Sequence, residues 1–185
     1  MQPVPASSDR TRRGFLCWGV AAAAATLPAP GWAAALGTAK RRLSFVNLHT
    51  DETLTALYWA NGSYQHKAVQ DINHLLRDFR TGDVHPIDLR LLDLLYTLQQ
   101  RVKSQSPFQV ISGYRSPTTN AKLASLSDGV ARNSYHVKGM AIDIALSDRA
   151  LPTLHQAALS LRAGGVGFYP KPGFVHVDVG PVRTW

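Results

Sequence analysis

Residues 134–146 read Ser-Tyr-His-Val-Lys-Gly-Met-Ala-Ile-Asp-Ile-Ala-Leu and pass from a polar loop into an apolar run. The length and composition of that run predict a buried strand over 140–146. Because side chains alternate across a strand, Ile142 and Ile144 share one face, and Asp143 lies on the other face among small alanines. The carboxylate therefore points away from the aliphatic layer.

A second strand, predicted over 174–179, repeats this arrangement. Its three valines share one face, while His176 and Asp178 lie on the other. Together with His136, which precedes the first strand, His176 and Asp143 suit a catalytic zinc site, which takes three protein ligands and keeps a fourth position open. The spacing fits equally well a surface His136, a capping Asp143 and a core His176.

Hydrophobic periodicity predicts the other elements of the chain. Strands are expected over 42–49, 53–59, 108–111 and 166–169, and helices over 65–80, 88–102, 118–126 and 149–162. The segment 127–134 has no clear period and is expected to be an irregular loop. Strands and helices do not alternate regularly, which disfavours a doubly wound parallel sheet. The predicted fold class is α+β, a mainly antiparallel sheet packed with helices in a single domain.

The first 35 residues differ in kind from the rest. Three arginines precede an apolar, alanine-rich run over 15–27, which is followed by prolines and small residues. This layout is typical of a secretory signal peptide, and the run is short for a membrane span. Thr11-Arg12-Arg13-Gly14-Phe15-Leu16 resembles the twin-arginine export motif, with an ordinary secretory signal as the alternative. We therefore expect a signal peptide over 1–35, a functional domain over 36–185 and a periplasmic location.

Charge and cysteine content restrict the chemistry of the exported domain. The net charge is +8, and residues 1–35 carry three arginines and one aspartate, so residues 36–185 retain +6. A basic exported domain favours an acidic polymer such as peptidoglycan and argues against nucleic acid, although the charge also fits plain solubility. The single cysteine, Cys17, lies in the signal, so a metal would rely on His, Asp or Glu. We expect a monomer with no stable membrane insertion after signal cleavage.

Several motifs that occur in order resemble a known family. The pattern Ser-x-His-x-x-Gly-x-Ala-x-Asp over 134–143, followed by His176, is similar to that of the zinc peptidases that include D-alanyl-D-alanine carboxypeptidases, dipeptidases and the amino-terminal domain of hedgehog. The chain resembles more narrowly their murein endopeptidase K branch, through Ser112-Gly-Tyr-Arg-Ser-Pro117, Asn120, Asn133-Ser134, Gly164-Gly-Val-Gly-Phe-Tyr-Pro170, Gly173-Phe-Val-His-Val-Asp178, Gly180, Arg183 and Trp185. The resemblance covers roughly residues 42–185.

The resemblance implies that zinc is bound by His136, Asp143 and His176 and that Arg115 polarises the substrate. Zinc would lower the pKa of its bound water toward about 7 and polarise the scissile carbonyl. Arg115 would then hydrogen-bond the oxyanion that develops. A structural salt bridge at a turn is the competing role for Arg115.

One position departs from the family pattern. The carboxypeptidase and dipeptidase relatives place a general-base glutamate three residues before the last histidine ligand, where this chain has Gly173. Asp178, on the same strand face as His176, is therefore a candidate catalytic carboxylate that would either accept the proton or orient a metal ligand. The remaining histidines lie outside the motifs and are expected to be surface or structural residues: His49, His66, His74, His85 and His155.

The function that the resemblance implies is a zinc-dependent murein endopeptidase, which hydrolyses the peptide crosslinks of peptidoglycan by metal-activated water. The crosslinks cut by the branch it resembles are notably those that join two diaminopimelate residues. One alternative is a D-alanyl carboxypeptidase that trims stem peptides. The other is a zinc-stabilised module that binds the cell wall without turnover, which the glycine at position 173 keeps open and which Arg115 and Asp178 argue against.

Overall fold

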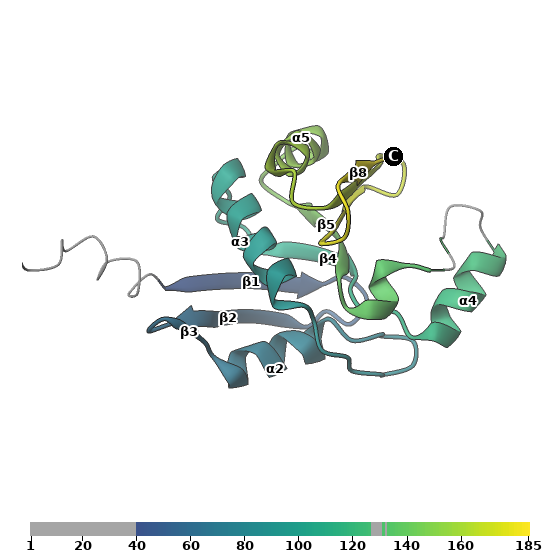
Figure 1. The fold of residues 1–185 in the computed structure, drawn as a ribbon, viewed down its shortest axis with the longest axis horizontal. Helices are drawn as coiled ribbons and strands as arrows, with labels where there is room; N and C mark the ends of the chain where they lie inside the picture. The colour runs from purple at the N-terminus through teal and green to yellow at the C-terminus, as the bar shows by residue number, and fades with distance from the viewer. Residues whose placement is uncertain (1–39, 127–130, 132) are drawn as a thin grey trace, which may run out of the picture. The chain divides into compact units, whose positions relative to one another are not determined.

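A single eight-stranded sheet organises the part of the chain that the computed structural model describes, residues 40–126, 131 and 133–185 (Figure 1). Its strands are β1 (Arg41–Asn47), β2 (Thr53–Ala60), β3 (Ser63–Tyr64), β4 (Phe108–Ser112), β5 (Ala141–Leu146), β6 (Gly165–Tyr169), β7 (Phe174–Asp178) and β8 (Arg183–Thr184). The strands lie in the order β3-β2-β1-β4-β5-β7-β6-β8. Neighbours are antiparallel except for β1–β4 and β6–β8, which are parallel. The predicted α+β class with a mainly antiparallel sheet is confirmed.

The helices are α2 (His66–Leu75), α3 (Leu89–Val102), α4 (Pro117–Leu126) and α5 (Leu151–Leu161), with one 3₁₀ turn, η1 (Tyr135–Lys138). Helix α2 packs on β2, α3 packs on β1 and on α5, and α5 packs on β5, β6 and β7. In Figure 1, α4 projects to the side, away from these three helices. Three of the described helices therefore cover the sheet, and α4 lies apart from them, where Asn120 donates a hydrogen bond to the carbonyl oxygen of Ala131 at 3.2 Å.

The aliphatic residues of the central strands face the helices and form the core. Ile142, Ile144 and Val175 are fully buried and belong to one cluster with the leucines of α3. Because alternate side chains of a strand point to opposite faces, Asp143 and His176 lie on the other side of the sheet. Alternation predicts that β5 and β7 each have an aliphatic face and a polar face. The polar residues of both strands lie on the face of the sheet opposite the core, so they can form a site together.

Helix α2 ends at Leu75 and not near residue 80, as the apolar periodicity predicts. The buried carboxylate of Asp78 explains the difference. It accepts hydrogen bonds from the backbone N–H groups of Arg80 (3.0 Å) and Ser116 (2.9 Å). An aspartate that hydrogen-bonds nearby backbone competes with helix continuation, and here it also ties the chain to the start of α4.

Two short strands are not predicted from the sequence, and two predicted segments lie mostly or wholly outside the described residues. Strands β3 and β8 have two residues each, which is too short for a periodic signal. The loop expected over 127–134 falls mostly outside the described residues, and the signal peptide expected over 1–35 falls wholly outside them. Within the described ranges, no helix has the length and apolar character needed to cross a membrane.

We expect Leu92→Ala to lower the free energy of unfolding by about 2–5 kcal/mol, because it removes a fully buried side chain of α3 and leaves a cavity. Urea unfolding followed by circular dichroism would measure the loss. Leu48→Ala is the matched control, since Leu48 is 47% exposed and its truncation should change the free energy by less than about 0.5 kcal/mol. Equal losses from the two variants would contradict the assignment of the core.

Candidate metal centre

The 3₁₀ turn η1 presents His136 to the polar face of the sheet. Ser134 precedes the turn, and its hydroxyl accepts a hydrogen bond from the backbone N–H of His136 at 3.3 Å. Gly139 ends the turn with a φ of 65°, and a Cβ there would lie 2.3 Å from the carbonyl oxygen of Pro86. Conformation and space thus both require glycine. With both ends of the turn fixed, the His136 side chain is held in one place.

Strands β5 and β7 place Asp143 and His176 directly opposite each other. The two residues are partners in the antiparallel register. Directly opposed residues have Cβ atoms only about 4.5–5.5 Å apart, so their side chains meet on the same face. On its other side, Asp143 is paired with Ser112 of β4, after an irregularity in that register. Strand pairing, and not nearness in the sequence, therefore assembles this part of the site.

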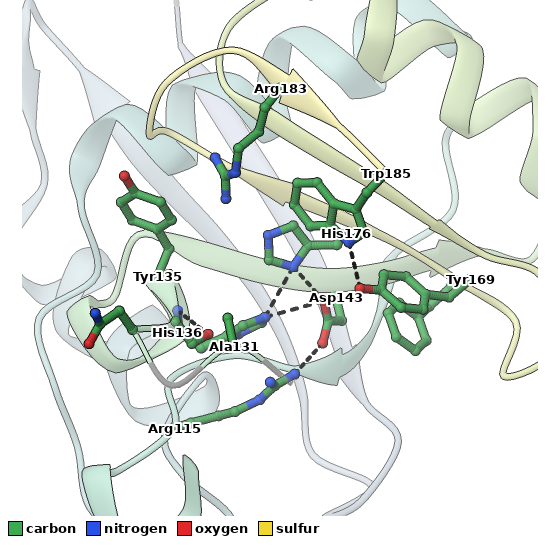
Figure 2. A pocket seen from close by; sticks show the side chains of 12 residues that line it. Arg115, Ala131, Tyr135, His136, Asp143, Tyr169, His176, Arg183 and Trp185 are labelled. Carbon is green, nitrogen blue, oxygen red and sulfur yellow. Dashed lines mark hydrogen bonds and ion pairs between the residues drawn. The ribbon is translucent and has the colours of Figure 1, made fainter. Parts of the chain in front are cut away.

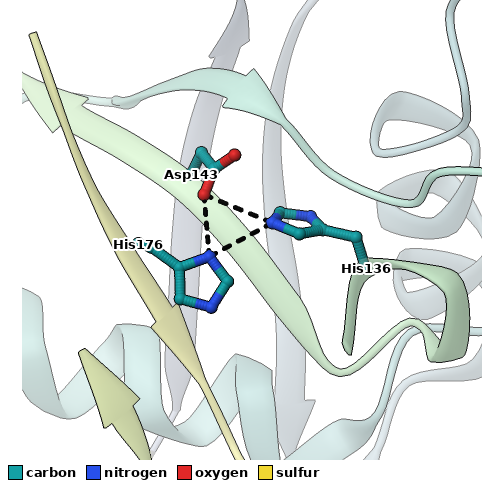
Figure 3. A group of neighbouring side chains, drawn as sticks. All are labelled: His136, Asp143 and His176. Atoms are coloured by element: carbon teal, nitrogen blue, oxygen red, sulfur yellow. Dashed lines mark hydrogen bonds and ion pairs between the residues drawn. The ribbon is translucent and has the colours of Figure 1, made fainter. Parts of the chain in front are cut away.

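The ligand atoms of His136, Asp143 and His176 converge on one point (Figure 3). His136 Nε2 lies 3.2 Å from both Asp143 Oδ1 and His176 Nδ1, and the latter two atoms are 2.9 Å apart. Ligands of a tetrahedral zinc, each about 2.0–2.1 Å from the metal, are about 3.3 Å apart. The spacing therefore suits zinc. Within the described residues, this is the one group of three His, Cys, Asp or Glu side chains with such convergence.

Hydrogen bonds on the outer side of each imidazole decide which nitrogen carries the proton. His136 Nδ1 lies 2.7 Å from the carbonyl oxygen of Gly113, which can only accept, so the proton of the neutral ring lies on Nδ1. His176 Nε2 lies 3.1 Å from Asp178 Oδ2 and donates to it. The inner nitrogens then present lone pairs to each other and to Asp143. Three converging acceptors with outer hydrogen bonds of this kind are the donor set that zinc takes, so the residues fit the metal.

The charges around the cluster favour a cation at its centre. Burial lowers the pKa of His136 and so keeps this imidazole neutral, as a metal ligand must be. Burial also opposes protonation of His176, but its contacts with Asp143 and Asp178 outweigh this effect and raise its pKa. Burial likewise opposes ionisation of Asp143, yet its contacts with the two histidines hold its pKa well below the usual value. The two carboxylates therefore stabilise positive charge beside them, whereas burial disfavours it on His136 itself.

The cluster opens into a pocket of about 400 Å³ (Figure 2). Aromatic side chains and two arginines line it beside the cluster: Tyr135, Tyr169, Phe174, Trp185, Arg115 and Arg183. Among the described residues, Asp143 is the one carboxylate in this lining. A concave site with a few convergent polar groups among aromatic walls suits the binding of a small molecule or a peptide.

Arg115 is tied to the cluster through its guanidinium. Its Nη2 donates to Asp143 Oδ2 at 2.5 Å, and its Nε donates to the hydroxyl of Ser112 at 2.8 Å. Asp143 Oδ1 is thereby left for the two histidines. The Nη1 group of Arg115 makes no hydrogen bond to any described residue, and the side chain lines the pocket. Arg115 thus forms the structural salt bridge and also offers one edge to a ligand.

Asp178 lies behind His176, is fully buried, and has both carboxylate oxygens bound by protein groups. It accepts hydrogen bonds from the backbone N–H groups of Gly165 (3.1 Å) and Gly180 (2.8 Å). Arg183 binds both of its oxygens, at 3.1 and 2.6 Å. Burial opposes the charged form, but the hydrogen bonds from His176 and Arg183 hold the pKa of Asp178 well below its usual value. This geometry fits the role of orienting His176 better than that of a proton acceptor.

Two glycines of β6 make room for the C-terminal strand. Strand β8 runs parallel to β6, with Gly165 opposite Arg183. A Cβ at Gly165 would lie 2.4 Å from Arg183 Nη1, and a Cβ at Gly167 would lie 2.7 Å from the ring of Trp185. Arg183 and Trp185 therefore pack directly on the backbone of β6, next to His176.

Gly173, which occupies the position of the glutamate in the carboxypeptidase relatives, lies in the turn between β6 and β7. Its φ is 82°, and its N–H donates to the carbonyl oxygen of Tyr169 at 2.9 Å. A side chain at this position would find open space but a strained backbone. The absence of a glutamate here is thus matched to the geometry of the hairpin.

The structure brings the three predicted ligands together and places the two predicted catalytic residues, Arg115 and Asp178, in contact with them. The sequence assigned no role to Tyr169, although alternation from Gly165 and Gly167 would have placed it on the polar face of β6. Other histidines stack on aromatic rings away from the cluster: His49 on Phe79, His85 on Tyr114 and His155 on Phe168.

The fold and the pocket together define an α+β domain with a candidate metal centre. These are the features expected of the class of peptidases that the sequence motifs resemble. The chain belongs to the family described as peptidoglycan L,D-endopeptidase MepK, which matches residues 35–185. It is 44% identical over 178 residues to the peptidoglycan L,D-endopeptidase MepK of Escherichia coli (strain K12), covering 96% of this chain and 98% of that one. It is 38% identical over 179 residues to the probable peptidoglycan L,D-endopeptidase MepK of Haemophilus influenzae, covering 96% of each chain. The resemblance seen in the motifs is confirmed.

We expect His176→Ala to lose stoichiometric zinc, because two protein ligands do not hold the metal as three do. Metal analysis of the dialysed protein would measure the zinc content. His155→Ala, which removes a histidine outside the cluster, should keep the zinc content of the unmodified chain. A full equivalent of zinc in His176→Ala would show that the ligand set is wrongly assigned.

We expect Asp178→Asn to weaken zinc binding by about 10–100-fold, while full occupancy is still reached at saturating zinc. The amide keeps the shape of the side chain but removes the charge that holds His176 Nε2. Competition with a chromophoric chelator would give the affinity. Asp148→Asn is the control, since Asp148 bonds to Ser104 and neither residue lines the pocket. Unchanged affinity in Asp178→Asn would remove its orienting role.

Proposed function

We propose that this protein is a zinc-dependent L,D-endopeptidase that hydrolyses peptide crosslinks of peptidoglycan. The observation that carries the proposal is the convergence of three ligand atoms, within 4.8 Å of one another, in a pocket of a chain that belongs to the MepK family. Relatives named as peptidoglycan L,D-endopeptidases match almost the whole length of this chain. The proposed ligands are His136, Asp143 and His176.

When bound, zinc would supply a nucleophilic water at neutral pH and polarise the carbonyl of the peptide bond. The residues of the chain hold the ligands in register for this chemistry. The Gly113 carbonyl and Asp178 keep the imidazole protons on the outer nitrogens, so the inner nitrogens remain available. These outer hydrogen bonds fix the tautomers and also the orientation of both rings.

Arg115 has two proposed tasks. Through Nε and Nη2 it holds Ser112 and the outer oxygen of Asp143. Through Nη1 it would donate a hydrogen bond to the carbonyl oxygen of the scissile bond, which gains negative charge as water adds. A guanidinium fixed on two edges is suited to this, because little side-chain freedom is lost when substrate binds.

Asp178 is proposed as a residue that positions His176, not as the general base. Its oxygens accept from His176, Arg183 and two backbone N–H groups. The described lining of the pocket contains no carboxylate other than Asp143, which is paired with Arg115. The chain's own contribution to the reaction is thus chiefly the positioning of ligands and the stabilisation of negative charge.

The location and partner follow from the proposed substrate. Peptidoglycan lies outside the cytoplasm, and the twin-arginine motif over residues 11–16 would deliver the domain there. We propose that the domain acts there as a monomer. The basic charge of the domain suits a polymer that carries carboxylates. We propose cleavage of the signal near residue 35, which leaves the zinc peptidase domain over 36–185.

The proposal is tested by digesting purified peptidoglycan with the protein, with and without a chelator, and by separating the released muropeptides for mass analysis. We expect the crosslinked dimers joined through L,D bonds to disappear, the chelator to stop this and added zinc to restore it. His176→Ala serves as the inactive control. Loss of terminal D-alanine alone would identify a carboxypeptidase, and intact crosslinks in the presence of bound zinc would favour a wall-binding module.

A further inference from the structure

Tyr169 ends strand β6 on the face that carries the candidate metal centre. Gly167 is paired with His176 across the β6–β7 ladder, and Tyr169 is two residues further along the same strand. Its ring stacks on Phe174, its cross-strand partner, with the ring centroids 4.6 Å apart. In Figure 2 the hydroxyl of Tyr169 points toward the interior of the pocket, on the side of Asp143. The strand register thus places a phenol on the same face and in the same pocket as the candidate metal centre.

The hydroxyl of Tyr169 is oriented by Trp185. The indole Nε1–H of Trp185 donates to the Tyr169 oxygen at 2.6 Å. An indole nitrogen can only donate, so the Tyr169 oxygen acts as acceptor in this bond and keeps its own O–H for another partner. Among the described residues, no acceptor for that O–H is found. The proton is therefore available to a ligand in the pocket.

Trp185 is 50% exposed, but its backbone is paired with β6 and its ring packs on Gly167. Its backbone N–H donates to the Val166 carbonyl at 3.3 Å, and its carbonyl accepts from the Phe168 N–H at 3.1 Å. The indole ring packs against the backbone of Gly167. The Arg183 guanidinium stacks over the same ring, 4.8 Å from its centroid. A donor that is held by backbone pairing and by ring packing sets the direction of the Tyr169 hydroxyl before substrate arrives.

The other tyrosine in the pocket lacks this arrangement. Tyr135 has its ring covered by the cationic groups of Arg183 and Lys138, at 4.9 and 5.2 Å from the ring centroid. Figure 2 shows its hydroxyl pointing away from the three ligands. Two tyrosines line one pocket, and only the hydroxyl of Tyr169 is both directed inward and held by a donor.

We propose that Tyr169 is a catalytic residue, whose O–H donates a hydrogen bond to the carbonyl oxygen of the peptide bond being cut, and that Trp185 is the residue that positions it. This inference rests on the proposed function. A water that has released one proton to solvent adds as hydroxide to the carbonyl carbon, and the π electron pair of the C=O bond moves to the carbonyl oxygen. This oxygen accepts a hydrogen bond from Tyr169, whose proton stays on the phenol. When the C=O bond re-forms, the C–N bond breaks and the amine leaves with a proton taken from solvent. The bond from Trp185 polarises the phenol and makes it a stronger donor. Such a donor acts more strongly on the transition state than on the bound peptide.

The test is steady-state kinetics of the full chain on purified crosslinked muropeptide dimers. We expect Tyr169→Phe to lower kcat by about 100-fold with KM changed by less than about 3-fold, because a lost transition-state contact appears in kcat. Trp185→Phe should lower kcat by about 10-fold, and the double variant should be no slower than Tyr169→Phe. Tyr96→Phe, which removes a phenol on α3 outside the pocket, is the control and should keep full activity. All variants should bind zinc to the same extent.

A second readout does not depend on activity. The chain has four tryptophans, and the indole N–H signal of Trp185 is identified in the NMR spectrum by its absence from Trp185→Phe. In Tyr169→Phe this signal should move upfield in both the metal-free and the zinc-loaded protein, because its acceptor is gone. The inference would be overturned if the signal did not move in Tyr169→Phe. It would also be overturned if Tyr169→Phe kept a kcat within about 3-fold of the unmodified chain or changed KM alone, or if the losses in kcat were additive in the double variant. If the unmodified protein cuts no crosslink, the proposed function fails, whereas the NMR result still reports on the pair.

Discussion

The structure depends on three acceptor atoms that face one another inside the protein. His136 Nε2, Asp143 Oδ1 and His176 Nδ1 lie 2.9–3.2 Å apart, and all three side chains are buried. The contacts around them keep them acceptors, since a backbone carbonyl and a buried carboxylate take the imidazole protons and a guanidinium takes the outer aspartate oxygen. Burial of such groups is costly unless opposite charge or hydrogen bonds compensate. The sheet, the 3₁₀ turn and the C-terminal strand are thus arranged around a place for a cation.

The cluster is held by two central strands, by one 3₁₀ turn and by the C-terminal strand. Asp143 and His176 are direct neighbours on two central strands, so their separation is set by the ladder itself. His136 comes from a single turn, which Ser134 and Gly139 fix at its ends. Strand β8 and the residue after it add the outer support. Arg183 of β8 binds the carboxylate behind His176, and the ring centroid of Trp185, which follows β8, lies 5.2 Å from that of His176. The last three residues of the chain thereby support the cluster and form part of the pocket wall.

The sequence predicts the features that depend on local rules, and long-range pairing decides the others. Alternation along β5 and β7 separates Asp143 and His176 from the aliphatic face, and the mixture of elements indicates the α+β class, because both follow from a period of two or of 3.6. Spacing alone leaves the metal site and a set of ordinary polar residues equally open, and the family resemblance was needed to choose. The register that joins β5 to β7, and the end of α2 at Leu75, depend on hydrogen bonds between distant segments, as the bond from Ser116 to Asp78 shows. Such bonds leave no periodic trace in the sequence.

The charge pattern of the pocket bears on the kind of chemistry that it favours. The hairpin turn has a glycine with a φ of 82° where a catalytic glutamate would be sought, and Asp178 has both oxygens occupied behind His176. Beside the cluster, two side chains of the described pocket lining keep a donor that is not bound to the protein, namely Arg115 at Nη1 and Tyr169 at its hydroxyl. Donors placed in advance stabilise negative charge as it forms, and they act more strongly where water is excluded. In the proposed peptide hydrolysis, the chain would therefore lower the barrier mainly at the carbonyl oxygen, and less by taking a proton from the attacking water.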